Sequence, residues 1–438
     1  MDSVLTIGDV ISGGHEGEHA ALRGWLHHIR TGGGILFLQL RDGTGMIQCT
    51  LKKDSVDAKE FEQLAAIPVE STIEISGVVR KDSRAPGGYE IAGDKVTVLY
   101  QAEGDFPIAR GKPELSHGPD FLLDKRHLDV RSHRLLTIMR IRARLVDELR
   151  KWLTEHGYLE VQMPILVNAA VEGGSTLFEV KYFDQKAYLT QSWQLYAEAM
   201  ISSVGKIFTV APSFRAEKSK TIRHLTEYWH LEVEEPWLDL DGLMRLEEQL
   251  VSSACRKIAE SMPEELKLVG RDPKELEKVE PPFTRLRYDE AVQLVQKSKP
   301  DFEWGRDMGW GEEKILTEGF DKPFFVTHFP KETKAFYHMP DPRNPALTLS
   351  VDLLAPEKYG EITGGGQRIH DLKQLLVRIS EEHLKPEDYE WYVDLRRYGT
   401  VPHSGFGMGI ERTLAWICKL DHIRDAIAFP RLINRIYP

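Results

Sequence analysis

The first hundred residues contain short stretches in which apolar and polar side chains alternate. This period is typical of strands with one buried face, and it is clearest over residues 19–30, 34–42, 45–53, 71–82 and 89–100. Between them lie the sequences that tight turns require, such as Asp42-Gly43 and Pro86-Gly87-Gly88. About five strands in about a hundred residues indicate a small closed β-barrel over residues 1–103. A small β-sandwich is the alternative.

The pattern changes after the predicted barrel. Residues 104–133 lack a clear period and carry three prolines, so we expect a hinge or linker there. A helical period then begins, and the helix should end at Gly157. Its apolar face has intervals of three, four or seven residues: Leu135, Met139, Val146, Leu149 and Leu153. Its other face is basic and is expected to be solvated: Arg140, Arg142, Arg144, Arg150 and Lys151.

The remainder of the chain, to Pro438, mixes helices with short apolar strands, as at 207–215, 229–236 and 323–330. Two runs of charged residues, at about 256–280 and 297–322, are interpreted as surface insertions. The predicted fold class is therefore α+β, with an all-β barrel ahead of a mixed domain over residues 134–438.

Composition and charge limit the function classes. The 438 residues include 57 Lys and Arg against 68 Asp and Glu, a net charge of −11, which argues against a protein that binds nucleic acid by a general positive field. Three widely separated cysteines, Cys49, Cys255 and Cys418, form no metal or disulfide pattern and favour a reducing compartment. The sequence has no secretory signal and no long apolar run, so we expect a cytoplasmic protein without a membrane segment.

Residues 214–234 are the most informative segment. A strand ends in Phe214-Arg215-Ala216-Glu217, a polar loop carries Arg223 and His224, and a second strand starts near Tyr228. Two antiparallel strands with such a loop can present arginines to a polyphosphate, because the planar guanidinium makes two charge-assisted hydrogen bonds. A charged surface hairpin is the alternative.

Two further segments carry candidate chemistry. Gly405, Gly407 and Gly409 allow close approach of a ligand just before a helix that begins near Arg412, although the pattern is not that of a Walker loop. Asp352 and Glu361 lie nine residues apart on two strands that a turn joins. Two carboxylates beside phosphate-binding arginines are typical of a Mg²⁺ site, and a solvated acidic hairpin is the alternative.

These segments resemble, in order, the three signature motifs of the class II aminoacyl-tRNA synthetases. Pro164 after the long helix resembles motif 1, residues 214–217 with their loop resemble motif 2, and residues 407–412 resemble motif 3. The resemblance covers essentially the whole chain. It implies an antiparallel-sheet catalytic domain over residues 134–438 and an OB-fold anticodon-binding domain over 1–103, as in the aspartate, asparagine and lysine subgroup.

Within this family the sequence resembles the asparagine-specific members of archaeal and eukaryotic type. The peptides that carry the resemblance are LTQSWQLYAE, RHLTEYWHLEVE, FPKETKAFYHM, GEITGGGQRI and VPHSGFGMGIER. Aspartate-specific members hold a lysine where this chain has Ala197 and an aspartate where it has Glu232. The difference has a physical logic, because a carboxylate substrate favours cations whereas a carboxamide offers both an acceptor and a donor.

The resemblance implies an ATP-dependent ligase that forms asparaginyl-AMP with Mg²⁺ and transfers asparagine to the 3′ adenosine of tRNA-Asn. It also implies a homodimer joined through motif 1. The alternatives are an aspartate-specific or non-discriminating enzyme of the same fold and a non-catalytic RNA-binding paralogue. Ala197 and Glu232 speak against the first, and retention of Arg215, Glu361 and Arg412 disfavours the second.

The same resemblance assigns roles to individual residues. Catalysis falls to Arg215 and Arg412. The ATP-binding set is Arg215, Glu217, Arg223, His224, Tyr228, Glu361, Gly409 and Arg412. The amino-acid-binding set is Glu172, Ser192, Gln194, Glu232 and Arg368. The metal ligands are Asp352 and Glu361, and the anticodon contacts are Arg30, Phe37 and Gln48. The nine-residue spacing of Asp352 and Glu361 suggests a one-residue insertion near Glu357 and Lys358. Trp193 is expected to have a packing role.

Overall fold

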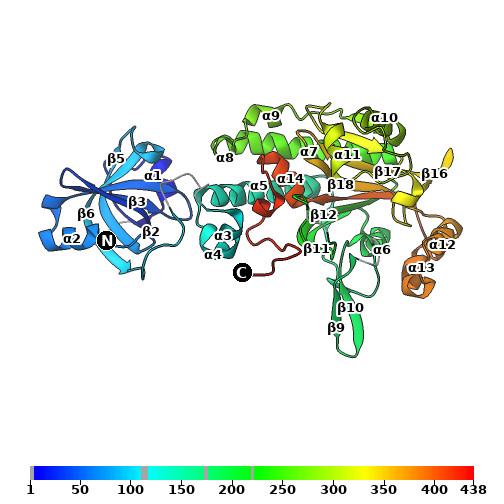
Figure 1. Cartoon of the computed structure of the whole chain (residues 1–438), viewed down its shortest axis with the longest axis horizontal. Coiled ribbons are helices and arrows are strands. Elements are labelled where there is room, and N and C mark those ends of the chain that lie inside the picture. The colour runs from blue at the N-terminus through cyan, green and yellow to red at the C-terminus, as the bar shows by residue number, and fades with distance from the viewer. Residues whose placement is uncertain (1–3, 110–116, 172–175, 219–220) are drawn as a thin grey trace. The chain divides into compact units, whose positions relative to one another are not determined.

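The N-terminal sheet of the computed structural model closes into a barrel (Figure 1). Its strands follow the order β1-β2-β3-β4-β6-β5, and β5 also pairs with β2. Their bounds are β1 (Val4–Leu5), β2 (His19–Gly32), β3 (Ile35–Arg41), β4 (Met46–Lys52), β5 (Thr72–Lys81) and β6 (Tyr89–Tyr100). Two helices, α1 (Ile7–Ile11) and α2 (Ala58–Ala65), accompany the barrel. Leu36, Leu38 and Leu40 are buried inside it, as the alternation predicts.

The structure describes residues 4–109, 117–171, 176–218 and 221–438. The chain divides into two compact units, Met1–Leu123 and Asp124–Pro438. Part of the segment that the sequence presented as a linker is helical, in α3 (Pro119–Asp124) and α4 (Arg126–Asp129). Helices this short show no recognisable period. Arg126 is buried and donates hydrogen bonds to the carbonyls of Ala428, at 2.7 Å, and Ile427, at 2.9 Å, so α4 is tied to the C-terminal segment.

The second unit is built on an eight-stranded sheet of order β13-β14-β17-β18-β19-β12-β11-β7. The central strands are antiparallel, and only the outer pairs β13–β14 and β7–β11 are parallel. Their bounds are β7 (Leu159–Glu160), β11 (Ile207–Phe214), β12 (Glu227–Pro236), β13 (Thr284–Arg287), β14 (Phe324–Thr327), β17 (Ser350–Ala355), β18 (Gly360–Gln367) and β19 (His403–Gly409). The predicted α+β class is confirmed.

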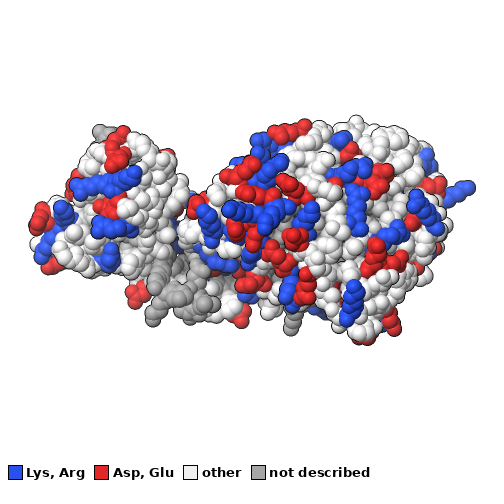
Figure 2. Space-filling model, turned by 90° about the horizontal axis from the view of Figure 1, so that it is seen from above, with Lys and Arg blue, Asp and Glu red and all other residues white. Residues whose placement is uncertain are grey.

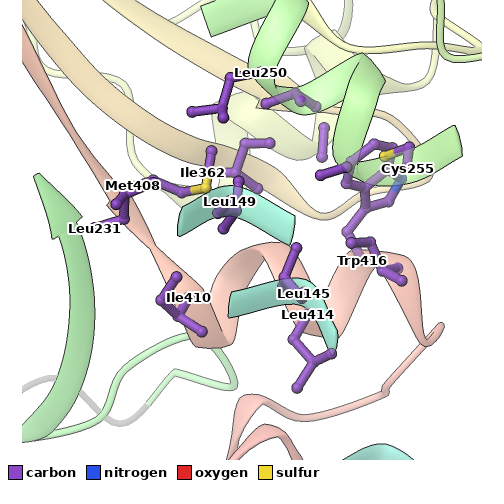
Figure 3. Packing of buried hydrophobic residues seen from close by; sticks show 14 of the residues in the cluster. Leu145, Leu149, Leu231, Leu250, Cys255, Ile362, Met408, Ile410, Leu414 and Trp416 are labelled. Atoms are coloured by element: carbon purple, nitrogen blue, oxygen red, sulfur yellow. The ribbon is translucent and has the colours of Figure 1, made fainter. Parts of the chain in front are cut away.

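Three helices cover one face of this sheet: α5 (His133–Glu155), α7 (Leu240–Ser261) and α14 (Ile410–Ile417). Leu149, Leu250 and Trp416 of these helices belong to one core cluster with Leu231 and Met408 of the strands (Figure 3). All five are almost fully buried. The opposite face of β12 and β19 is left for polar side chains.

Smaller elements complete the second unit. A three-stranded sheet consists of β8 (Leu166–Val167), β10 (Gln185–Leu189) and β9 (Glu179–Tyr182), and β15 (Pro340–Asp341) pairs with β16 (Asn344–Thr348). The remaining helices are α6 (Gln194–Val204), α8 (Pro263–Leu268), α9 (Pro273–Glu277), α10 (Tyr288–Ser298), α11 (Trp310–Thr317), α12 (Leu372–Glu381) and α13 (Glu390–Arg397). No helix within the described ranges is long and apolar enough to span a bilayer.

Three expectations from the sequence are wrong. Residues 256–280 are not a surface insertion, because Leu266 and Leu276 enter the main core and Arg271 is 1% exposed, bonded to the carbonyls of Trp416 and Ile417. Residues 297–322 likewise place apolar side chains in a second core cluster: Phe302, Met308 and Leu316. The basic face of α5 is not wholly solvated, since Arg142 pairs with buried Glu411 at 2.6 Å.

Candidate active site

A cavity of about 550 Å³ lies on the polar face of the eight-stranded sheet. It brings together residues that the sequence scatters over more than two hundred positions. The predicted residues that line it are Ser192, Gln194, Arg215, Arg223, His224, Tyr228, Glu232, Asp352, Glu361, Arg368, Gly409 and Arg412. Glu217 lies beside it, with its carboxylate 3.8 Å from His224. Glu172 lies outside the described residues.

Strand alternation on β12 and β19 builds the floor of this cavity. Along β12, Leu231 and Val233 point into the core, while His230, Glu232 and Glu234 face the cavity. The neighbouring β19 is rich in glycine, which leaves room for these long side chains. A Cβ at Gly405 would overlap the Glu234 carboxylate, so glycine is required there.

One end of the cavity carries the arginines of motifs 2 and 3. Arg215 follows β11 and its backbone N–H donates to the Thr226 carbonyl at 3.0 Å. Arg412, in the first turn of α14, donates from Nη1 to Glu361 Oε2 at 2.7 Å. The Tyr228 ring stands edge-to-face on His230, with centroids 4.8 Å apart. This end therefore offers two cations and an aromatic surface.

His224 is held as a neutral imidazole at this end. Its Nδ1 hydrogen-bonds Thr221 Oγ1, and its Nε2 faces Glu217. Burial and the nearby Arg412 lower the pKa of His224 below its ordinary value. A neutral ring offers one donor and one acceptor, which suits contact with a nucleotide without adding charge.

Asp352 and Glu361 converge on one face of the β17–β18 hairpin. The register shifts by one residue between the pairs Leu353–Thr363 and Leu354–Glu361, which leaves Ile362 as the extra residue. This bulge, and not the turn at 357–358, places Glu361 on the same face as Gly364. A Cβ at Gly364 would lie 3.1 Å from Glu361 Oε1 and 3.4 Å from Asp352 Oδ1.

The two carboxyl groups differ in acidity. Burial raises the pKa of Asp352 to about 7, with Glu361 adding to the shift and Lys334 opposing it. For Glu361 burial acts in the same direction, but Arg412 and Arg223 outweigh it and lower the pKa to about 2. Converging carboxylate oxygens are the donors that Mg²⁺ prefers, so these residues fit the predicted metal.

The Arg223 guanidinium is bonded to other groups of the protein. Its Nη1 is paired with Glu313, and its Nη2 donates to the Glu361 carbonyl at 2.8 Å. Glu313 also accepts a hydrogen bond from the Glu361 backbone N–H at 2.7 Å. Glu313 is therefore a site residue that the sequence reasoning missed, because it lies in the charged run taken for a surface insertion.

The other end of the cavity is suited to an amino acid. Glu232 Oε2 accepts a hydrogen bond from the Trp193 backbone N–H at 2.6 Å. Arg368 is bonded to Glu234, which the sequence reasoning also missed, although it follows Glu232 by two residues on the same strand face. Trp193 itself is buried, in line with the expected packing role.

A buried ionic network lies behind this end. Glu198 accepts hydrogen bonds from Gln194 Nε2 at 3.0 Å and from the Tyr392 hydroxyl, and it pairs with Arg396 and with His403 Nε2 at 3.0 Å. Burial opposes ionisation, yet the cations lower the pKa of Glu198 far below its ordinary value. The network fixes Gln194 from behind.

The predicted anticodon residues lie together on the outer face of the barrel. Phe37 is only partly buried, in contrast to Leu36 and Leu38 on either side of it. The Arg30 guanidinium lies over the Phe37 ring, 4.2 Å from its centre. Gln48, on β4 beside the β3 strand that carries Phe37, donates to Glu90 Oε2 at 3.1 Å. A partly exposed ring with an arginine and an amide nearby is a surface on which a single-stranded base can stack.

Comparison with known proteins agrees with this geometry. The family model described as tRNA synthetases class II (D, K and N) matches residues 118–433, and the OB-fold nucleic acid binding domain matches residues 20–99. Asparagine–tRNA ligase from Pyrococcus furiosus is 48% identical, with 97% of each chain covered. The enzyme of the same name from Thermoplasma acidophilum is 44% identical over 99% of this chain and 100% of its own.

Solved structures give the same result. The crystal structure of asparaginyl-tRNA synthetase from Pyrococcus horikoshii complexed with asparaginyl-adenylate superposes with a TM-score of 0.94 at 48% identity, covering 97% of each chain. The asparaginyl-tRNA synthetase of Entamoeba histolytica reaches a TM-score of 0.89 at 31% identity over the full length of both chains. The chain belongs to the asparagine–tRNA ligases, a branch of the class II aminoacyl-tRNA synthetases of the aspartate, lysine and asparagine group.

Proposed function

We propose that the cavity activates asparagine with ATP to form asparaginyl-AMP and diphosphate, and then transfers asparagine to the 3′ adenosine of tRNA-Asn. The proposal rests on one observation: the end that carries the motif arginines and the end suited to an amino acid belong to the same cavity. Arg215 and Arg412 stand at one end, and Glu232 with the neutralised Arg368 stands at the other. The relative from Pyrococcus horikoshii is complexed with asparaginyl-adenylate, a molecule that has both an asparagine part and a nucleotide part.

In the first step an oxygen of the asparagine carboxylate attacks the α-phosphorus, and the bond to the β-phosphate oxygen breaks. The attacking group is already an anion, so the step needs no general base. Arg215 stabilises the charge that develops on the α-phosphate, and Arg412 covers the adenine and holds the leaving phosphates. The protein's contribution is then positioning and charge stabilisation.

Asp352 and Glu361 would hold Mg²⁺ when ATP is bound. Bound there, the ion would neutralise charge on the diphosphate leaving group. Arg223 and Glu313 support this corner, because they fix the backbone of Glu361 from both sides.

Selection of asparagine rests on Glu232 and Arg368. Glu232 has acceptor capacity for the substrate NH₂, and Arg368, which Glu234 holds through Nε and Nη2, would donate from Nη1 to the amide oxygen. Ala197, where aspartate-specific members hold a lysine, adds no cation. The pocket therefore favours a neutral side chain over a carboxylate.

Pyrophosphate exchange tests the substrate directly. Asparagine-dependent exchange with little or no aspartate-dependent exchange is expected, and the reverse result would establish an aspartate-specific enzyme. Arg215→Ala should abolish exchange while leaving the fold intact by circular dichroism. Retained exchange in that variant would show that catalysis lies elsewhere.

For tRNA, we infer that Phe37 stacks on an anticodon base and that Arg30 and Gln48 contact the same region. Recognition by a few local contacts agrees with the surface charge, since Lys and Arg are interleaved with Asp and Glu on the face in Figure 2. Asparagine charging of tRNA-Asn, with no charging of tRNA-Asp, is the matching assay.

A homodimer through motif 1 is the expected assembly. Around Pro164 the described surface exposes Leu159, Ile165 and Leu166 by 40% to 52%, next to β7 at the open edge of the large sheet. Exposed apolar side chains beside an unpaired strand edge favour association with a second copy. Light scattering should give twice the chain mass of 50.0 kDa, and a value of 50.0 kDa would contradict the dimer.

We place the protein in the cytoplasm, where tRNA is charged. Its three cysteines are free and buried, as in a reducing compartment. Cell fractionation with an antibody to the chain tests this.

A further inference from the structure

A lysine side chain sits directly on one of the two proposed metal ligands. Lys334 follows the short 3₁₀-helix η5 (Lys331–Thr333), and its Nζ lies 2.8 Å from Asp352 Oδ1 and 2.7 Å from Oδ2. The same Nζ is 4.0 Å from the centre of the Phe329 ring. The side chain is only 16% exposed and lines the cavity. Lys334 lies within the peptide FPKETKAFYHM, but none of the roles assigned above uses it.

The contact matters for metal binding because of the charge balance in the corner of the cavity that Asp352 and Glu361 form. Glu361 already has Arg412 as its counter-ion, at 2.7 Å. Asp352 has Lys334, which engages both of its oxygens. Both prospective metal ligands are thus neutralised by cations of the protein itself. A divalent cation that enters this corner must displace the Lys334 ammonium from Asp352 and also meets its positive charge.

The two counter-ions, Arg412 and Lys334, also differ in geometry and flexibility. Arg412 is a planar fork that suits a fixed geometry, whereas the lysine ammonium is a point charge on a flexible four-carbon stem. Lys334 can therefore leave Asp352 if another anion becomes available in the cavity. The β- and γ-phosphates of ATP are such an anion, and they enter the same cavity.

We propose that Lys334 is an internal counter-cation that keeps free Mg²⁺ off Asp352 until ATP arrives. When the nucleotide binds, the ammonium moves from Asp352 to the polyphosphate and Asp352 becomes available to the metal. Metal binding and nucleotide binding then depend on one another. The inference rests on the Mg²⁺ site proposed above and adds an order to it: the metal enters with ATP and not before it.

The test is a titration of the full chain with Mn²⁺, followed by the electron paramagnetic resonance signal of the free ion. It is made without nucleotide and with a saturating non-hydrolysable ATP analogue, on wild type, Lys334→Met and Lys331→Met. Lys331 is a matched control, because it lies on the same segment but pairs with surface Glu381 at 3.3 Å. Thermal unfolding checks that all three proteins are folded.

Without nucleotide, Lys334→Met should bind Mn²⁺ at least about tenfold more tightly than wild type, since one repelling charge is gone. Its affinity for the analogue should fall, and the analogue should improve its Mn²⁺ affinity less than it does in wild type. Lys331→Met should behave as wild type. Lys334→Arg retains the charge and should keep nucleotide-free Mn²⁺ binding weak, which separates loss of charge from damage to the fold.

Two other results are informative in different ways. If wild type and Lys334→Met bind Mn²⁺ equally without nucleotide, and Asp352→Asn abolishes that binding, the metal site stands and the role of Lys334 is refuted. If no Mn²⁺ binds even with the analogue, the metal site is wrong and the inference falls with it.

Discussion

Glu234 accepts two hydrogen bonds from the guanidinium of Arg368: Nε donates to Oε1 at 3.0 Å and Nη2 donates to Oε2 at 3.1 Å. Both side chains are less than 5% exposed. Although burial opposes it, Glu234 raises the pKa of Arg368 above its ordinary value. Burial raises the pKa of Glu234, and Arg368 opposes that shift. A two-point bond also fixes the plane of the guanidinium, and with it the direction of the remaining N–H groups.

Glu234→Gln should reduce the preference for asparagine over aspartate. The substitution adds one net positive charge beside the substrate side chain and removes one of the two anchors of Arg368, and both changes favour a carboxylate. We expect the ratio of kcat/KM for asparagine to that for aspartate, measured by pyrophosphate exchange, to fall by about tenfold or more, which corresponds to about 1.4 kcal/mol.

Glu235→Gln is the matched control for this experiment. Glu235 is the next residue of β12, and it pairs with Lys206 at 2.8 Å outside the cavity. It should leave the ratio unchanged. An equal loss of activity toward both amino acids in Glu234→Gln would mean that the pair serves stability alone.

Glu313→Gln should impair use of ATP more than use of asparagine. Glu313 is the shared partner of the Arg223 guanidinium and the Glu361 N–H, so its loss leaves a buried arginine unpaired beside the proposed metal site. We expect kcat/KM for ATP to fall by at least about tenfold, an effect typical of a broken buried charge pair, together with a lower Tm.

Glu312→Gln isolates this effect, because Glu312 is on the same helix and equally buried but pairs with Lys299 away from the cavity. A similar loss of kcat/KM for ATP in both variants would contradict the assignment of Glu313.

A buried carboxyl outside the cavity gives a prediction for the pH dependence of stability. Glu247 is fully buried, with Thr363 Oγ1 as a hydrogen-bond donor, and burial raises its pKa from 4.5 to about 8. Between these two values the folded chain retains a proton that the unfolded chain has lost. The contribution of Glu247 to stability therefore falls as pH rises from about 4.5 to about 8, by up to about 1.4 kcal/mol per pH unit.

Glu247→Gln removes this dependence. The variant should unfold at higher denaturant concentration than wild type near pH 8, and the difference should shrink toward pH 4.5. Exposed Glu264→Gln serves as control and should follow wild type throughout. A difference that is constant with pH would show that Glu247 does not titrate in this range.

The sequence predicts the barrel and the long helix because their periods extend over many residues. It fails for residues 256–280, where the helices are short and charge dominates the composition. Leu266 and Leu276 are apolar positions within that run, but burial of Arg271 depends on carbonyls of Trp416 and Ile417, far along the chain. Local pattern carries no information about such a partner.

The candidate site likewise contains residues that the sequence predicts and residues that it does not. Residues of the motifs, such as Arg215, Glu361 and Arg412, are found from the sequence and do meet in one cavity. Glu313 and Lys334 are not assigned a role, because each contacts a residue from a distant part of the chain: Glu313 pairs with Arg223 of the motif 2 loop, and Lys334 pairs with Asp352 of β17. Their roles become visible only when the sheet places them against Arg223 and Asp352.

The barrel provides the last prediction, which concerns tRNA alone. Phe37→Ala should raise the KM for tRNA-Asn in aminoacylation by about tenfold, since stacking of a base on an aromatic ring contributes about 1–3 kcal/mol. Asparagine-dependent pyrophosphate exchange should not change, because Phe37 belongs to the N-terminal unit and exchange requires only the cavity of the second unit. Trp25→Ala removes a ring of the same barrel that is 42% exposed and should leave the KM for tRNA-Asn near that of wild type. Equal effects of the two substitutions would point to a general loss of barrel structure, and no effect of Phe37→Ala would remove Phe37 from the anticodon contact.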